Sequence, residues 1–217
     1  MSDVWDALGT VVDPELDEPV TDLGFVSEAV VVEGHAHVRL RLPTYFCAPN
    51  FAYLMVADAY EAVRALPSVT TVDVRLEDHF AAEEINAGVA ASAGFTRSFP
   101  GEAAGELDEL RLVFQRKAYL AALDRLCLRL PGSPVGLTLA DVPPSRALTS
   151  LLRRRAVLGV DCSSGSPLLL DEHGDPITEE EAPLRLRFAR SVRVSIEGNA
   201  GFCRGLLHTR YPEGVGN

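Results

Sequence analysis

The sequence lacks several features that would assign a common class at once. The four cysteines, at positions 47, 127, 162 and 203, form no Cys-x-x-Cys pair, which argues against a zinc ribbon or finger. No apolar run approaches the roughly twenty residues that span a bilayer. Walker loops, dinucleotide-binding fingerprints and nucleophile elbows are also absent. These absences exclude the best-marked zinc-finger, membrane, nucleotide-binding and hydrolase classes.

Positive charge is scarce as well. The chain has 20 basic against 31 acidic residues and a net charge of −11, which disfavours nucleic acid as a partner. The basic run at residues 153–155 is short and fits the solvated end of a helix. The first residues, MSDVWDALG, carry acids where a signal peptide carries bases. We therefore expect a cytoplasmic protein with reduced thiols and no membrane partner.

What is present is the composition of a globular protein, with 47% hydrophobic residues among 217. Apolar residues at helical spacing predict a first helix that begins near Ser2 and ends before Pro14. Residues 25–32 and 35–42 predict an antiparallel hairpin that turns at Glu33-Gly34, and the second strand alternates apolar and polar side chains. Asn50 is the predicted cap of a helix over residues 51–66.

A third strand over residues 69–76 completes an α+β unit, which we assign to residues 1–80. Residues 81–105 are predicted as a connecting segment that ends in a Gly/Pro-rich loop. Residues 106–217 are predicted as a mixed α/β C-terminal region. Its expected elements are helices over residues 107–130 and 145–158, a strand with a turn at 168–176, and one or two strands over 184–196.

Four separated motifs carry a family resemblance. They are Asp13-Pro14-Glu15, Asp22-Leu23-Gly24, Thr44 and Cys47, with a hairpin and a helix in the expected places. This order resembles the small domain of the SufT and PaaD proteins, which assist iron–sulfur cluster assembly. The resemblance covers about residues 3–80, a third of the chain. One departure is Cys47-Ala48-Pro49, where the family usually has Cys-Pro.

The resemblance implies an accessory factor that assists iron–sulfur cluster or iron-centre assembly in a client metalloprotein, without turnover of its own. Iron or a transient iron–sulfur cluster is then its cargo, and client proteins or assembly machinery are its partners. The later part of the chain is similar to fused versions found with bacterial di-iron monooxygenases. That similarity implies a di-iron monooxygenase as client and assigns client recognition to residues 106–217.

Cys47 is the principal candidate ligand, because it precedes a predicted helix whose positive dipole end favours a thiolate. Its structural alternative is a small buried residue. Asp13, Glu15 and Asp22 flank turns, where they either shape the surroundings of the thiol or hold the turns. Thr44 either orients Cys47 or closes its turn.

The tail supplies a second group of candidate ligands. Cys203 and His208 lie among glycines at 198, 201 and 205, which permit tight backbone paths. The sequence therefore predicts a tail that folds back and adds Cys203 or His208 to Cys47. In the competing hypothesis, a homodimer bridges one cluster between two copies of Cys47. His35 and His37 are spaced to bind a metal, but a wet strand face beside arginines indicates solvated side chains.

Two other functions stay open at this point. Cys47 can act as the nucleophile of a cysteine-dependent enzyme if a histidine base reaches it. Alternatively, the chain is an adaptor that binds no metal and only holds proteins together.

Overall fold

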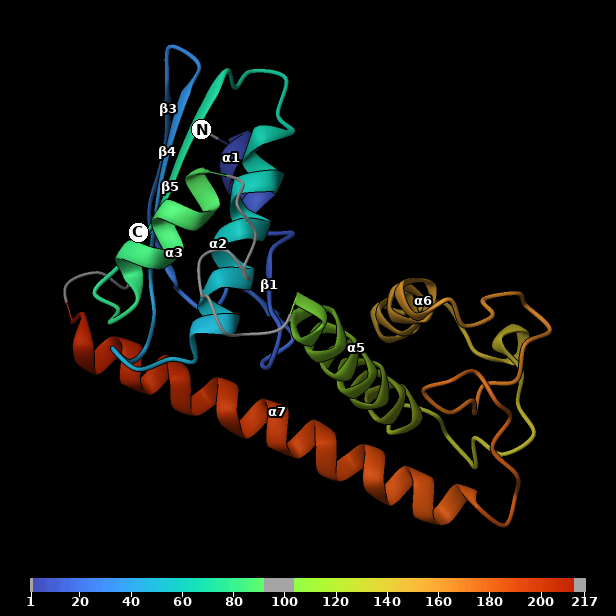
Figure 1. Ribbon diagram of the computed structural model, residues 1–217. Coiled ribbons are helices and arrows are strands. Elements are labelled where there is room, and N and C mark those ends of the chain that lie inside the picture. Colours follow the sequence, from blue (N-terminus) through green and yellow to red (C-terminus); the bar gives the residue numbers. More distant parts are fainter. Residues whose placement is uncertain (1, 92–103, 213–217) are drawn as a thin grey trace. The chain divides into compact units, whose positions relative to one another are not determined.

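The computed structural model describes residues 2–91 and 104–212, which fall into two compact units (Figure 1). The first unit comprises residues 1–108 together with 199–217, and the second comprises residues 109–198. Helices and a mixed sheet confirm the predicted α+β class. No helix in the described ranges is long and apolar enough to cross a bilayer.

The first unit opens with helix α1 (Ser2–Leu8), which is shorter than predicted. The chain leaves the helix at Gly9, whose N–H donates to the carbonyl of Trp5 at 2.8 Å. Strand β1 (Val12–Asp13) then pairs antiparallel with β2 (Glu18–Pro19). The prediction that the helix continues to Pro14 was wrong, because Val12 belongs to this small ladder.

The main sheet has the order β3-β4-β5. Strands β3 (Val26–Val32) and β4 (His35–Arg41) form the predicted antiparallel hairpin, and β5 (Thr71–Glu77) runs parallel to β4. The turn between β3 and β4 places Glu33 at φ 49° and Gly34 at φ 82°. Turns with two positive φ angles match the twist of paired strands. The hairpin prediction is confirmed.

One face of this sheet carries the core of the first unit. Ala36, Val38 and Leu40 of β4 are buried, as their alternation predicted. Helices α1 and α2 (Pro49–Arg64) lie on one side of the sheet in Figure 1. Helix α2 begins at Pro49 with Ala48 as its N-cap, so the prediction of Asn50 as the cap was wrong.

The opposite face of the sheet is polar and internally paired. Arg39 contacts Asp73 at 2.9 Å, and Arg41 contacts Glu77 at 2.8 Å across the β4–β5 register. His37 lies 3.7 Å from the Asp73 carboxylate, while His35 hydrogen-bonds Thr71. The two histidines therefore have partners on β5.

Helix α3 (Ala82–Ala90) follows β5 and packs against α2 and β5. It forms the first part of the predicted connecting segment. The Gly/Pro-rich loop predicted for the rest of that segment lies mainly at residues 92–103, outside the described ranges.

The second unit is helical. It holds most of α5 (Ala104–Cys127), the single turn η1 (Leu139–Asp141), α6 (Arg146–Leu158) and the first part of α7 (Ala182–Arg210). Helix α6 begins as predicted, since the Ser145 hydroxyl accepts the N–H of Leu148 at 3.2 Å, and it ends at Gly159 with φ 70°. Residues 109–198, all described in secondary structure, contain isolated bridges but no strand, so the strands predicted at 168–170 and 184–196 were wrong.

Arg155 organises the irregular segment that follows α6. Its guanidinium is fully buried and donates to four oxygens at 2.8 to 3.2 Å, which belong to Asp161, Ser166, Pro167 and Leu168. Three of these acceptors are backbone carbonyls, so the Arg155 side chain satisfies carbonyl groups that would otherwise pair in a β-ladder. The basic run 153–155, predicted to be solvated, is therefore partly a structural element.

Candidate functional site

The loop between β4 and α2 presents Cys47 to its surroundings. The N–H of Phe46 donates to the Thr44 hydroxyl oxygen at 3.3 Å, and that hydroxyl lies 3.3 Å from Sγ of Cys47. Because the hydroxyl oxygen already accepts this bond, its own hydrogen is free to point at the sulfur. The Thr44 hydroxyl therefore contacts both the Cys47 thiol and the backbone of its turn. Helix α2 starts two residues later, at Pro49.

His79 fixes the backbone of the same loop. The N–H of Ala81 donates to His79 Nδ1 at 3.2 Å, so Nε2 carries the proton and donates to the carbonyl of Cys47 at 2.7 Å. Burial lowers the pKa of His79, and the nearby Arg210 acts in the same direction. The imidazole is thus held neutral as a positioning group. No sequence motif marked His79, since its partner is 32 residues away.

Both Cys47 and Cys203 line one cavity of about 140 Å³ in the first unit. Its walls are mostly apolar, and its lining also includes the two acids of the first motif, Asp13 and Glu15. The apolar lining residues are Leu16, Phe25, Leu42, Pro43, Ala48, Phe51 and Met55. The cavity therefore brings two soft sulfur donors and two carboxylates together within a mostly apolar lining.

Asp13 is the buried acid of this site, with 7% of its surface exposed. Its Oδ1 accepts the N–H groups of Glu15 at 2.9 Å and Leu16 at 2.8 Å, so it holds the turn of its own motif. Burial raises its pKa from 3.8 to about 6, against the lowering effect of these two bonds. The structural role expected for Asp13 is present, and the same carboxylate also lines the cavity.

Cys203 comes from the last part of α7, which belongs to the first unit. Burial raises the pKa of its thiol to about 11, and the negative charges of Asp13, Cys47 and Glu15 act in the same direction. Free Cys203 is therefore a protonated thiol at neutral pH. A metal that binds it must displace the proton.

The remaining predicted site residues lie apart from the thiols. Asp22 is exposed and accepts a hydrogen bond from the Thr21 hydroxyl at 3.3 Å. His208 is also exposed and is not part of the cavity lining. In the described part of the chain, no three His, Cys, Asp or Glu side chains form a metal-binding group.

Gly24 of the second motif has a packing role. Its φ of +77° is a left-handed conformation that favours glycine. A Cβ placed there would lie 3.3 Å from Cδ2 of Leu207 on α7. The motif therefore accommodates the last turns of α7 as well as its own turn.

Three exposed aromatic rings, which we call the aromatic patch, adjoin Cys47. Tyr45, Phe46 and Phe80 are 46%, 77% and 49% exposed, and their ring centroids lie 5.1 to 6.5 Å apart. The N–H of Phe80 donates to the carbonyl of Tyr45 at 3.2 Å, which joins the two loops. Sequence reasoning missed this patch because Phe80 is distant in the chain, although the Tyr-Phe pair before Cys47 was a visible signal.

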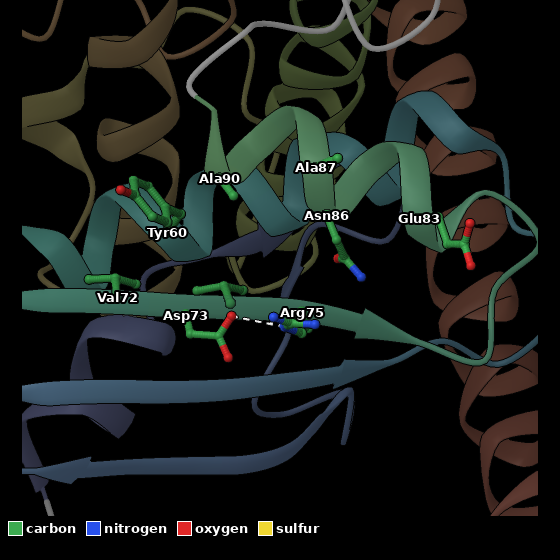
Figure 2. A pocket seen from close by; sticks show the side chains of 9 residues that line it. Tyr60, Val72, Asp73, Arg75, Glu83, Asn86, Ala87 and Ala90 are labelled. Atoms are coloured by element: carbon green, nitrogen blue, oxygen red, sulfur yellow. Dashed lines mark hydrogen bonds and ion pairs between the residues drawn. The ribbon is translucent and has the colours of Figure 1, made fainter.

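A second cavity, of about 360 Å³, lies between β5 and α3 and is shown in Figure 2. It is the larger of these two cavities, but its lining contains no cysteine or histidine. Asp73 in its wall is paired with Arg75 and Arg39, and the Asn86 amide pairs with both backbone groups of Leu76. Asp73, Arg75 and Asn86 are thus engaged within the protein, and the thiol-lined cavity is the stronger candidate.

Comparisons with known proteins assign the first part of the chain. The family model described as "Iron-sulfur cluster assembly protein" matches residues 1–74. The "Uncharacterized protein MJ1129" of Methanocaldococcus jannaschii is 36% identical over 86 residues, which are 39% of this chain and 87% of that protein. The chain belongs to the iron–sulfur cluster assembly protein family. No solved structure matches it. The matched residues carry Asp13, Thr44 and Cys47, whereas Cys203 lies outside them.

Proposed function

We propose that this chain is an accessory factor of the SufT/PaaD type that takes up iron or an iron–sulfur cluster on Cys47 and passes it to a client metalloprotein. One observation carries the proposal: Cys47 precedes α2, lies 3.3 Å from the Thr44 hydroxyl, and lines a cavity together with a second thiol. Cysteine thiolates are the usual ligands of iron–sulfur clusters.

The surroundings of Cys47 suit cargo that is held only for a time. The cavity beside Cys47 is lined mostly by apolar side chains, and the family role in iron–sulfur cluster assembly supplies the cargo class. With few protein ligands, iron keeps coordination positions that the client's own side chains can occupy. Transfer then proceeds as ligand exchange, without turnover of a substrate by this chain.

The aromatic patch supports a protein partner at Cys47. Exposed clusters of apolar side chains mark interaction sites, and aromatic residues are enriched there. The net charge of −11 argues for protein rather than nucleic-acid partners. Its four free thiols suit a reducing compartment, so we place this activity in the cytoplasm. A di-iron monooxygenase is the client class that the fused C-terminal region suggests, with residues 106–217 in client recognition.

A cysteine-dependent enzyme is less well supported. Such an enzyme needs a base on its thiol, yet His79, which contacts this loop, bonds the carbonyl of Cys47 rather than Sγ. An adaptor that binds no metal is the other alternative, because the aromatic patch alone would be enough to bind a partner protein.

Anaerobic reconstitution with ferrous iron and sulfide tests the proposal. After desalting, the full-length chain should retain iron, Cys47→Ala should fall to background, and Cys162→Ala should match the unmodified chain. Cys162 is the matched control because its thiol is exposed and lies in the second unit. The loaded protein should then restore the cluster spectrum of an apo-ferredoxin used as a stand-in acceptor.

Retention of iron that does not depend on Cys47 would refute this mechanism. An iron-free chain that still binds a client protein through the aromatic patch would favour the adaptor. A substrate turned over only when Cys47 is present would favour the enzyme.

A further inference from the structure

The last turns of α7 are fixed to the first unit at several points. Ala200 and Leu207 are buried in its core. Arg210 donates to the carbonyl of Leu42 at 3.0 Å, and the Tyr211 hydroxyl donates to the Asp78 carboxylate at 2.9 Å. Arg204 also pairs with Glu18. This segment is therefore an integral wall of the first unit, although it lies over a hundred residues beyond the family match.

Within this segment, helical geometry selects which side chain faces the cavity. Cys203 follows Ala200 by three residues and precedes Leu207 by four, so it lies on the buried face with them. His208 is five residues beyond Cys203, about 140° further around the helix, and it is exposed. The helix therefore brings the Cys203 thiol to the cavity and leaves His208 on its outer side.

We infer that Cys203 is a second cargo ligand, so that the cavity holds iron or the edge of a cluster through two thiols. One thiol, Cys47, comes from the family domain and the other from the C-terminal extension. This inference rests on the proposed function and adds a ligand that the family match does not contain. The extension then completes the cargo site, in addition to any contact that residues 109–198 make with a client.

Two thiols give a chemically specific site. Paired sulfur donors select soft or borderline ions over magnesium and calcium, which prefer oxygen ligands. Four protein ligands complete the usual iron–sulfur site. A pair therefore leaves two of these four positions to ligands of the acceptor, which allows the cargo to leave.

Contacts with the two family motifs hold the part of α7 that carries Cys203 beside the cavity. Asn199 Nδ2 reaches Glu15 at 3.5 Å, so α7 meets the first motif directly beside the cavity. Gly24 of the second motif leaves the space that Leu207 occupies. Both motifs thus contact the helix that carries Cys203.

The test uses the full-length chain and its Cys203→Ser variant, which keeps the size of the side chain and replaces sulfur by oxygen. Cys47→Ala and Cys162→Ala accompany it, and unfolding followed by Trp5 fluorescence verifies that each variant folds. After anaerobic reconstitution, Cys203→Ser should lose iron to the same extent as Cys47→Ala, while Cys162→Ala keeps it. Full retention by Cys203→Ser would overturn the inference and leave the proposed function standing, and a dimeric holo-form would then indicate a cluster bridged by two Cys47 thiols.

A second measurement needs no iron. Phenylarsine oxide binds two neighbouring thiols far more tightly than one, so one equivalent should protect Cys47 from maleimide in the unmodified chain and in Cys162→Ala. Protection should be lost in Cys203→Ser. Equal protection of Cys47 in Cys203→Ser would overturn the inference. If iron binding fails in every form while the arsenical result holds, the proposed cargo is wrong and the two-thiol site for a soft ion stands.

Discussion

Ionisation of Asp13 should destabilise the first unit at neutral pH. Burial raises the pKa of this carboxyl from 3.8 to about 6. The stability it contributes is therefore fully present below pH 3.8 and is lost as pH rises through about 6, because the folded state binds the proton more tightly. Each pKa unit corresponds to about 1.4 kcal/mol, so the loss between pH 3 and pH 8 is about 3 kcal/mol.

Asp13→Asn isolates this effect. The amide oxygen can still accept the N–H groups of Glu15 and Leu16, while the ionisable proton is gone. Urea unfolding followed by fluorescence of Trp5, the single tryptophan and a residue of the first unit, measures the free energy of unfolding at each pH. The stability of the variant relative to the unmodified chain should increase by about 3 kcal/mol from pH 3 to pH 8.

Asp22→Asn is the control, because that carboxylate is exposed and keeps its hydration on folding. Its stability curve should run parallel to that of the unmodified chain. All measurements include a chelator, so that metal binding does not add its own pH dependence. If the Asp13→Asn curve also runs parallel to that of the unmodified chain, burial does not control this carboxyl and the reasoning fails.

Three further predictions follow from individual contacts. Gly24→Ala should destabilise the first unit by about 1–3 kcal/mol in the Trp5 assay, because alanine is strained at positive φ and its Cβ meets Leu207; an unchanged midpoint would contradict this. Arg155→Met should lower stability by at least about 3 kcal/mol, measured by circular dichroism, since four oxygens lose their donor; a loss under 1 kcal/mol would show that water replaces it. His79→Ala should release the Cys47 carbonyl and speed alkylation of that thiol several-fold at constant pH; a rate that matches the unmodified chain would remove its positioning role.

Local patterns were sufficient for the hairpin, α2, α6 and the main motifs. Alternation along β4 predicted which side chains are buried, because successive residues of a strand must face opposite sides. Ser145 marked the start of α6, where its side chain accepts a hydrogen bond from Leu148. Gly159 marked the end, where its backbone is left-handed. Glu33-Gly34 fixed the turn for the same local reason.

The prediction failed where two periods were present in one segment. Residues 184–196 alternate over short stretches, which favoured strands, but they lie in α7. Its inward positions are spaced by four and three residues in turn, which is the helical period, and the longer window decides between the two. These positions are Ala182, Leu186, Ala189, Arg193, Ile196, Ala200, Cys203 and Leu207. The arginine among them concealed the pattern, because Arg193 reaches buried Asp124 at 2.6 Å, a partner 69 residues away.

The sequence by itself determined the family motifs, the candidate thiol Cys47 and the order of elements around it, because each depends on neighbours within a few residues. The tertiary structure decided which distant groups join that thiol. Cys203, His79 and Asp13 reach the site or its loop only through packing of α7, of the β5–α3 loop and of the first turn. Burial and long-range contact are properties of the packed chain, so no local pattern could place Cys203 in the cavity and His208 on the outer side of the same helix.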